Sequence, residues 1–146
     1  MNSPSPDAPV EACPPPLMWQ DVRREYLAQS TFQQVESAGG PVAIRSWGTG
    51  PPLYFLASFS APAELYCLLI WLLRDEYRCV TIEPVGDDLG QSLRPFDVEV
   101  ELLFAAADAQ GDEVCTLFGA NYGAAWGLAA ARQFPQRVSR LILLQG

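Results

Sequence analysis

The stretch CTLFGANYGAAWGLAAARQFP, Cys115 to Pro135, has the layout of a turn that could do chemistry. An apolar, strand-like run leads into Gly119 and Gly123, which flank a central residue, and a helix rich in small residues follows. Some enzymes present a nucleophile on such a turn. The central residue here is Asn121, whose amide nitrogen is delocalised into its carbonyl and is not a useful nucleophile. A histidine base is also missing, because none of the 146 residues is a histidine.

Alternating strands and helices are expected to position this turn. From Leu53 onward, short and almost wholly apolar runs alternate with longer runs of helical period, a pattern typical of parallel strands covered on both faces. The sequence therefore predicts an α/β fold, a mostly parallel doubly wound sheet with an N-terminal antiparallel hairpin. The expected strands are 32–37, 42–47, 53–57, 79–83, 113–118 and 138–144, and the expected helices are 17–30, 62–77, 97–110 and 122–134.

Three details of these elements bear on the site. Sites in such sheets form beyond the carboxyl ends of the strands, so we expect the loops after Ala57, Glu83 and Phe118 to hold it. Asp97 is a candidate N-cap, and Trp126, on the helix after the turn, is expected in the core. The helix at 62–77 is predicted from leucines at helical spacing, Leu65, Leu68, Leu69 and Leu72.

Gly119-Ala120-Asn121-Tyr122-Gly123 resembles the G-x-S-x-G nucleophile elbow of the α/β-hydrolase family in everything but its centre. The likeness extends over roughly 32–146: Gly90-Gln91-Ser92 is similar to the family's G-x-S loop, and FPQRVSRLILLQG, 134–146, to its passage into the sixth strand. The resemblance implies the first six strands of that fold, truncated after the sixth. The spacing in WGTGPPLYFL, 47–56, also resembles the maspardin branch, which is associated with binding rather than catalysis but keeps a serine at the elbow.

The departures from the family bear on function. The resemblance implies a serine nucleophile, a histidine base and an acid, whereas this chain has Asn121 at the apex and no histidine. The family's histidine-glycine pair, which shapes the oxyanion hole, is matched by Ala57-Ser58. Only backbone N–H groups, such as those of Tyr122 and Phe59, are therefore expected as oxyanion donors. We expect a pseudoenzyme without a cofactor.

The last expected strand, 138–144, points to a partner. The family continues there with a lid, a seventh strand that carries the acid, and an eighth strand followed by the histidine. An apolar edge strand with unpaired backbone groups is normally covered or paired. We therefore expect a protein partner or self-association that covers this strand, unless the chain is a fragment.

Several functional interpretations remain open. The first is an inactive α/β-hydrolase-fold protein that acts by binding. The second is the N-terminal half of a hydrolase of esters or related substrates, in which a histidine from a missing C-terminal part could activate a water. The third is a dinucleotide-binding domain with Gly119, Gly123 and Gly127 as a phosphate cradle, although their spacing is not G-x-G-x-x-G. A fold that acts by contact alone is the fourth.

The composition limits which classes of partner and which cellular compartment are expected. Nine basic and 17 acidic residues give a formal charge of −8, with no clustered Lys and Arg to hold nucleic acid or an anionic membrane. No apolar run approaches the ~20 residues of a membrane span. The four cysteines form no CxxC pair, so no metal site is expected, and reduced core thiols in a cytoplasmic protein are the default.

Two further segments have simple structural explanations. The proline-rich start, 1–16, has no secretory signal and is expected to be a flexible tail before the short helix at 17–30 and a domain at 31–146. Asp87 and Asp88 could be paired carboxylates for acid-base work, but an acidic pair in a turn is more often a solvated loop.

Overall fold

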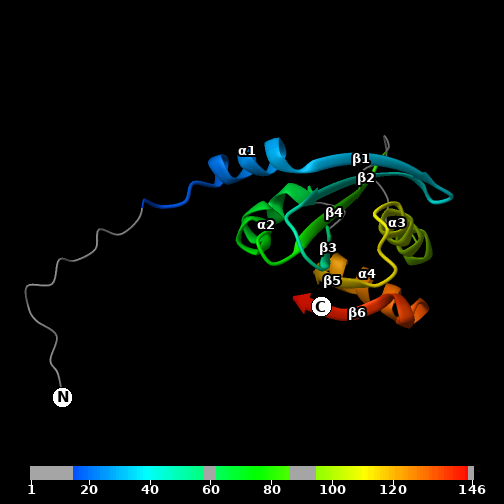
Figure 1. Cartoon of the computed structure of the whole chain (residues 1–146). Coiled ribbons are helices and arrows are strands. Elements are labelled where there is room, and N and C mark those ends of the chain that lie inside the picture. Colours follow the sequence, from blue (N-terminus) through cyan, green and yellow to red (C-terminus); the bar gives the residue numbers. More distant parts are fainter. Residues whose placement is uncertain (1–14, 58–61, 86–94, 145–146) are drawn as a thin grey trace, which may run out of the picture.

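The strands are β1 Thr31–Ser37, β2 Gly40–Trp47, β3 Pro52–Leu56, β4 Arg78–Pro84, β5 Cys115–Ala120 and β6 Val138–Leu144. They form one sheet in the order β1-β2-β4-β3-β5-β6 in this computed structural model, which describes residues 15–57, 62–85 and 95–144. β1 and β2 form the expected antiparallel hairpin, and β2 pairs antiparallel with β4. The strands β3 to β6 run parallel to one another, which confirms the predicted mostly parallel sheet (Figure 1).

Helices cover both faces of this sheet. Leu53 and Phe55 of β3 are buried in one cluster with side chains of the first two α-helices, whereas Tyr54 and Leu56 are buried in another with the last two (Figure 1). Alternate residues of a strand point to opposite faces, so the doubly wound prediction is confirmed. No helix in the described part of the chain is long and apolar enough to cross a membrane. The helical elements are α1 Trp19–Gln29, the 3₁₀ turn η1 Ala63–Tyr66, α2 Cys67–Leu73, α3 Phe96–Ala109, α4 Tyr122–Gln133 and the 3₁₀ turn η2 Pro135–Arg137.

The helix predicted at 62–77 is shorter than expected and does not bury its leucine face. The buried side chains of η1 and α2 are Ala63, Cys67 and Ile70. Small side chains at 63 and 67 let the helix lie close to the sheet, where Cys67 and Ile70 share a core cluster with Phe55. Three of the leucines are exposed instead, with fractions of 56%, 42% and 61% at Leu65, Leu68 and Leu72.

The helix expected at 17–30 is confirmed as α1, and it packs into the core. Val22 and Tyr26 are each only 1% exposed. Tyr26 Oη and Thr81 Oγ1 share a hydrogen bond of 2.8 Å. Burial raises the pKa of Tyr26 to about 12. α1 therefore packs into the same body as the sheet.

Two side-chain predictions on α3 and α4 have opposite outcomes. The N-cap prediction for Asp97 is wrong, because α3 begins at Phe96 after Pro95 and no side chain caps its first turn. Asp97 lies within that turn, where its negative charge interacts favourably with the helix dipole. Its side chain also accepts a 2.8 Å hydrogen bond from Gln133 Nε2. The core position of Trp126 is confirmed, since this side chain is 2% exposed.

Candidate functional site: an elbow with asparagine at its apex

Asn121 stands at a sharp turn between β5 and α4. Its backbone angles are φ 52° and ψ −117°, and no other non-glycine residue in the described ranges has a positive φ. Residues with a Cβ rarely adopt a positive φ, because the Cβ crowds the backbone carbonyl. Such strain persists only where the surrounding structure imposes it. The turn therefore has the strained backbone expected of an elbow, with Asn121 at its apex.

The flanking glycines make this turn sterically possible. A Cβ on Gly119 would overlap the carbonyl oxygen of Gly123, and a Cβ on Gly123 would overlap the carbonyl oxygen of Leu56 in β3. A Cβ on Gly127 would meet Leu141 Cδ1 at 2.8 Å. Protein atoms thus fill the space beside all three glycines, and close packing of α4 explains them without a phosphate cradle.

Backbone hydrogen bonds tie the apex to β6. The Asn121 N–H donates to Leu144 O at 3.1 Å, and the Asn121 carbonyl accepts from the Ala124 N–H at 3.0 Å. The Asn121 side chain is exposed, and it makes no hydrogen bond that caps α4. The elbow therefore presents an accessible amide on a fixed backbone.

Aromatic side chains gather next to the elbow. Tyr122 stacks on Phe96 of α3, with ring centroids 5.3 Å apart and an interplanar angle of 24°. Phe118 of β5 meets Tyr66 of η1 edge-on at 5.7 Å, and Tyr66 Oη donates to Leu56 O at 3.4 Å. Burial raises the pKa of Tyr66, so this hydroxyl stays protonated. Neither Phe96 nor Tyr66 lies in a motif, so the sequence alone did not point to them.

A carboxylate at the carboxyl end of β4 has a structural partner. Glu83 Oε1 accepts a hydrogen bond from the Ala63 N–H, the first residue of η1. This bond satisfies an N–H that has no partner within its own helix. Glu83 therefore holds η1 at the edge of the sheet where the elbow lies.

The structure places two of the three predicted site residues. Asn121 lies at the apex of the turn and Tyr122 begins α4, whereas the assignment of Asn121 to the nucleophile position stays a prediction. The role of the Tyr122 backbone N–H as an oxyanion donor stays a prediction. Phe59 lies outside the described residues, as do Asp87-Asp88 and the Gly90-Gln91-Ser92 loop.

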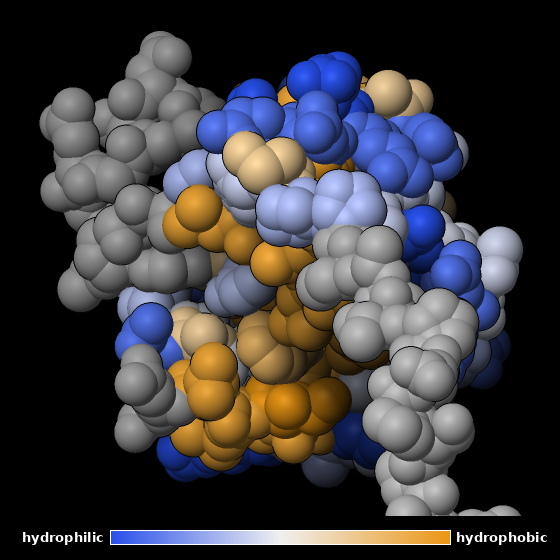
Figure 2. All heavy atoms as spheres, turned by 90° about the vertical axis from the view of Figure 1, so that its left-hand side faces the viewer, coloured by the Kyte–Doolittle hydropathy of each residue, from blue (hydrophilic) through white to orange (hydrophobic). Residues whose placement is uncertain are grey.

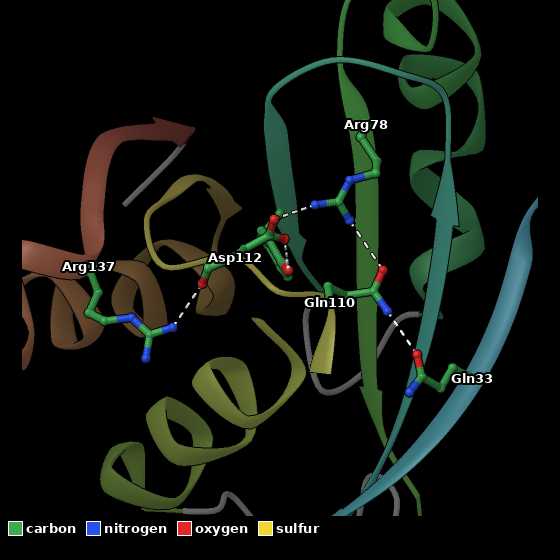
Figure 3. A network of polar contacts seen from close by, with 6 residues as sticks. Gln33, Arg78, Gln110, Asp112 and Arg137 are labelled. Carbon is green, nitrogen blue, oxygen red and sulfur yellow. Dashed lines mark hydrogen bonds and ion pairs between the residues drawn. The ribbon is translucent and has the colours of Figure 1, made fainter. Parts of the chain in front are cut away.

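A polar network lies toward the amino ends of the parallel strands, opposite the elbow (Figure 3). Tyr54 Oη donates to Asp112 Oδ2 at 2.6 Å, and Arg78 pairs with Asp112 Oδ1. Arg78 also donates to Gln110 Oε1 at 3.2 Å, and Gln110 donates to Gln33 Oε1 at 2.9 Å. Burial, and then the hydrogen bond to Asp112, raise the pKa of Tyr54 well above its usual range. The network joins β1, β3, β4 and the residues that precede β5.

The three described cysteines are buried, free thiols, as expected for core residues. Burial raises the pKa of Cys79 and of Cys115 to about 12, and it also raises that of Cys67. Because the thiolate is the reactive form, burial makes these three thiols poor nucleophiles near neutral pH. Within the described residues, no group of three or more His, Cys, Asp or Glu could hold a metal ion.

Comparisons with known proteins identify this architecture. No protein-family model and no curated protein sequence matches the chain. Among solved structures, it is similar to carboxylesterase CesB from Bacillus subtilis, with 18% identity and a TM-score of 0.69 over 86% of this chain and 47% of that one. It is also similar to epoxide hydrolase VrEH1 from Vigna radiata, with 19% identity and a TM-score of 0.70 over 82% of this chain and 41% of that one. An epoxide hydrolase from an endophytic Streptomyces has 21% identity and a TM-score of 0.68 over 78% of this chain and 36% of that one. The chain spans less than half the length of these three proteins. It has the α/β-hydrolase fold, with an antiparallel hairpin followed by four parallel strands and an elbow.

Proposed function

We propose that this chain is a catalytically inactive α/β-hydrolase-fold protein that acts by binding. The observation that supports this most is the residue at the elbow. Asn121 occupies the strained apex where the fold resemblance implies a serine, and the chain has no histidine to serve as base. The elbow therefore keeps its geometry without the groups that acyl transfer needs.

An asparagine side chain can still recognise a ligand at this position. Its amide offers two N–H donors and a carbonyl acceptor, which can pair with a ligand's carbonyl or carboxylate. The stacked rings of Tyr122 and Phe96 offer apolar contact beside it. The proposed role is reversible, non-covalent binding. The buried free thiols suit a reducing compartment, so a cytoplasmic location is part of this proposal.

Ester turnover tests the proposal. We expect the wild-type chain to hydrolyse p-nitrophenyl acetate no faster than buffer, with an active α/β-hydrolase assayed alongside as the positive control. Asn121→Ser should bring no gain, because the general base is still missing, and Asn121→Ala serves as its matched control. Turnover that depends on the introduced serine would show that a base is present and would remove the proposal.

A second candidate is the N-terminal half of a hydrolase that needs a C-terminal part. Two observations favour it: the chain spans less than half the length of the three proteins compared above, and β6 pairs only with β5 among the described residues. Ile142, Leu143 and Leu144 of β6 are 46%, 40% and 55% exposed. Figure 2 shows apolar side chains gathered on the end of the molecule where α2 and the tip of β6 lie. Exposed apolar surface of this kind marks interaction sites.

In both candidates, another polypeptide or a second copy of the chain covers β6. Self-association through β6 can be tested by measuring the size of the chain in solution. Light scattering over a range of concentrations should show association for the wild-type chain. Ile142→Lys on β6 should reduce it, because a charged edge resists pairing. Leu128→Lys is the control, at a position of α4 that is 52% exposed. Equal effects of the two variants would mean that β6 is not the contact.

A further inference from the structure

A second surface, apart from the elbow, runs along one face of α3. It is a groove of about 610 Å³ between the β1–β2 turn, α3 and the end of α4, and none of its lining residues lies in the elbow. α3 contributes five side chains over about three turns, mostly three or four residues apart, a spacing that puts them on one helix face. These groove residues of α3 are Asp97, Glu101, Phe104, Ala105 and Asp108.

The floor of the groove is aromatic and partly open to solvent. Phe104 and Phe134 meet edge to face, with ring centroids 5.1 Å apart and an interplanar angle of 71°. Phe134 leaves 40% of its surface exposed, whereas Phe104 is 7% exposed. Ala38 and Ala105 complete the apolar lining. The groove thus offers an apolar seat large enough for one side chain of a partner.

The rim of the groove is acidic. Asp97 and Glu101 of α3 line it together with Glu36 at the end of β1. Asp97 accepts a hydrogen bond from a neutral amide, which leaves its charge in place. Among the described residues neither Glu36 nor Glu101 takes part in a salt bridge. Within the described part of the chain, these carboxylates therefore face the groove without a paired cation.

Among the described lining residues, the one cation, Arg137, is already engaged. Arg137 pairs with Asp108 at 2.6 Å and donates to the carbonyl oxygen of Glu113. It also donates to the carbonyl oxygen of Asp112 (Figure 3). Its guanidinium carbon also lies 4.7 Å from the centre of the Phe104 ring. Arg137 therefore neutralises Asp108 and fixes the position of the neighbouring loop. The remaining carboxylates keep the electrostatic potential in the groove negative.

We propose that this groove docks a basic segment of another protein, with Lys or Arg side chains on both sides of one apolar side chain. The apolar side chain packs on Phe134, and the cations pair with Glu36, Glu101 and Asp97. Asp97 and Asp108 span about 17 Å of helix at 1.5 Å per residue, which suits an extended segment of about five residues. The net charge of −8 also draws cationic partners toward the molecule.

Fluorescence anisotropy with a fluorescein-labelled Lys-Lys-Leu-Lys-Lys peptide tests this proposal on the full chain. We expect binding that weakens as salt is added, because exposed charges are screened. Lys-Lys-Gly-Lys-Lys should bind more weakly, since it lacks the apolar side chain, and Glu-Glu-Leu-Glu-Glu should not bind. Spermine, which supplies charge alone, should compete poorly. Absence of salt-sensitive binding, or spermine that competes as well as the leucine peptide, would overturn the proposal.

Variants locate the binding to the groove. Glu36→Gln with Glu101→Gln removes two charges at nearly constant shape and should weaken binding by about tenfold, given the usual strength of exposed ion pairs. Asp75→Asn with Glu76→Gln removes two exposed charges in the turn after α2 and should change binding less than about twofold. Equal weakening in both pairs would contradict the proposal.

Phe134→Ala tests the apolar seat separately. In this variant the leucine and glycine peptides should bind alike, because the ring that distinguishes them is gone. A retained preference for leucine would place the apolar contact outside the groove and overturn that part of the proposal. Circular dichroism checks that the variant is folded, and the charge variants test the groove independently of it.

Discussion

The elbow and the polar network toward the amino ends of the strands are built in opposite ways. At the elbow the unusual feature is the backbone: Asn121 has a strained conformation that Gly119 and Gly123 make possible. In the network the unusual features are side chains, since buried Tyr54 donates to Asp112, which also pairs with Arg78 (Figure 3). One region is defined by the backbone geometry around an asparagine, and the other by ionisable side chains that pair with one another.

The two regions differ in the signals that could mark a functional site. Strongly changed pKa values often mark functional residues, because catalysis needs tuned groups. Here the raised pKa values of Tyr54 and Cys115 come chiefly from burial in the core. The strained turn at Asn121 is the better guide to a candidate site, since such strain clusters at ligand-binding and active sites.

The largest expected effect comes from filling the space that the elbow needs. Gly123→Ala should lower the free energy of unfolding by about 3 kcal/mol, because the new Cβ would overlap the carbonyl oxygen of Leu56. Gly127→Ala is the matched control on the same helix. Its Cβ would meet a movable methyl group of Leu141, so we expect a loss of about 1 kcal/mol. Urea unfolding followed by tryptophan fluorescence measures both, and similar losses would contradict the backbone account of the elbow.

Removing a carboxylate tests the network. Asp112→Ala should cost about 2 kcal/mol, because it leaves the buried Tyr54 hydroxyl and the Arg78 guanidinium without their partner. The comparison is Asp21→Ala, which removes an exposed partner of Arg24 and should cost less than about 0.5 kcal/mol. If both variants unfold at the same urea concentration, the network does not stabilise the fold.

Alkaline pH should weaken the core that surrounds the network. The folded-state pKa of Cys115 is raised from 9.0 to about 12, so its contribution is complete below pH 9 and is lost as pH rises toward 12. At pH 10 this thiol alone should remove about 1 kcal/mol of stability relative to pH 8. Cys115→Ala should lose less over the same interval in chemical unfolding. An equal pH dependence in the two proteins would mean that the thiol titrates normally.

The smallest effect is expected at the apex itself. Asn121→Gly should change stability by no more than about 0.5 kcal/mol, because relief of backbone strain offsets the greater freedom of glycine in the unfolded chain. Ala125→Gly, at an exposed position on α4, has no strain to relieve and should cost about 1 kcal/mol. A larger loss for Asn121→Gly would show that the asparagine side chain stabilises the turn.

Local sequence signals predicted the parts of this fold that depend on neighbouring residues. The strands follow from apolar runs, and the elbow follows from the spacing of Gly119 and Gly123. The buried face of α2 was not predictable, because packing on Phe55 favours Cys67 and Ile70 over the leucines. The network was not predictable either, since Gln33, Arg78 and Asp112 are far apart in sequence and meet only through the sheet.

The most direct test of the central claim is the reaction of Asn121→Ser with a fluorophosphonate probe, followed by intact mass spectrometry. This probe labels serines that a neighbouring base activates. We expect no adduct in this variant beyond that of Asn121→Ala, because the chain has no histidine to serve as the base. A single adduct that appears only with the serine would show an activated nucleophile and would contradict the account.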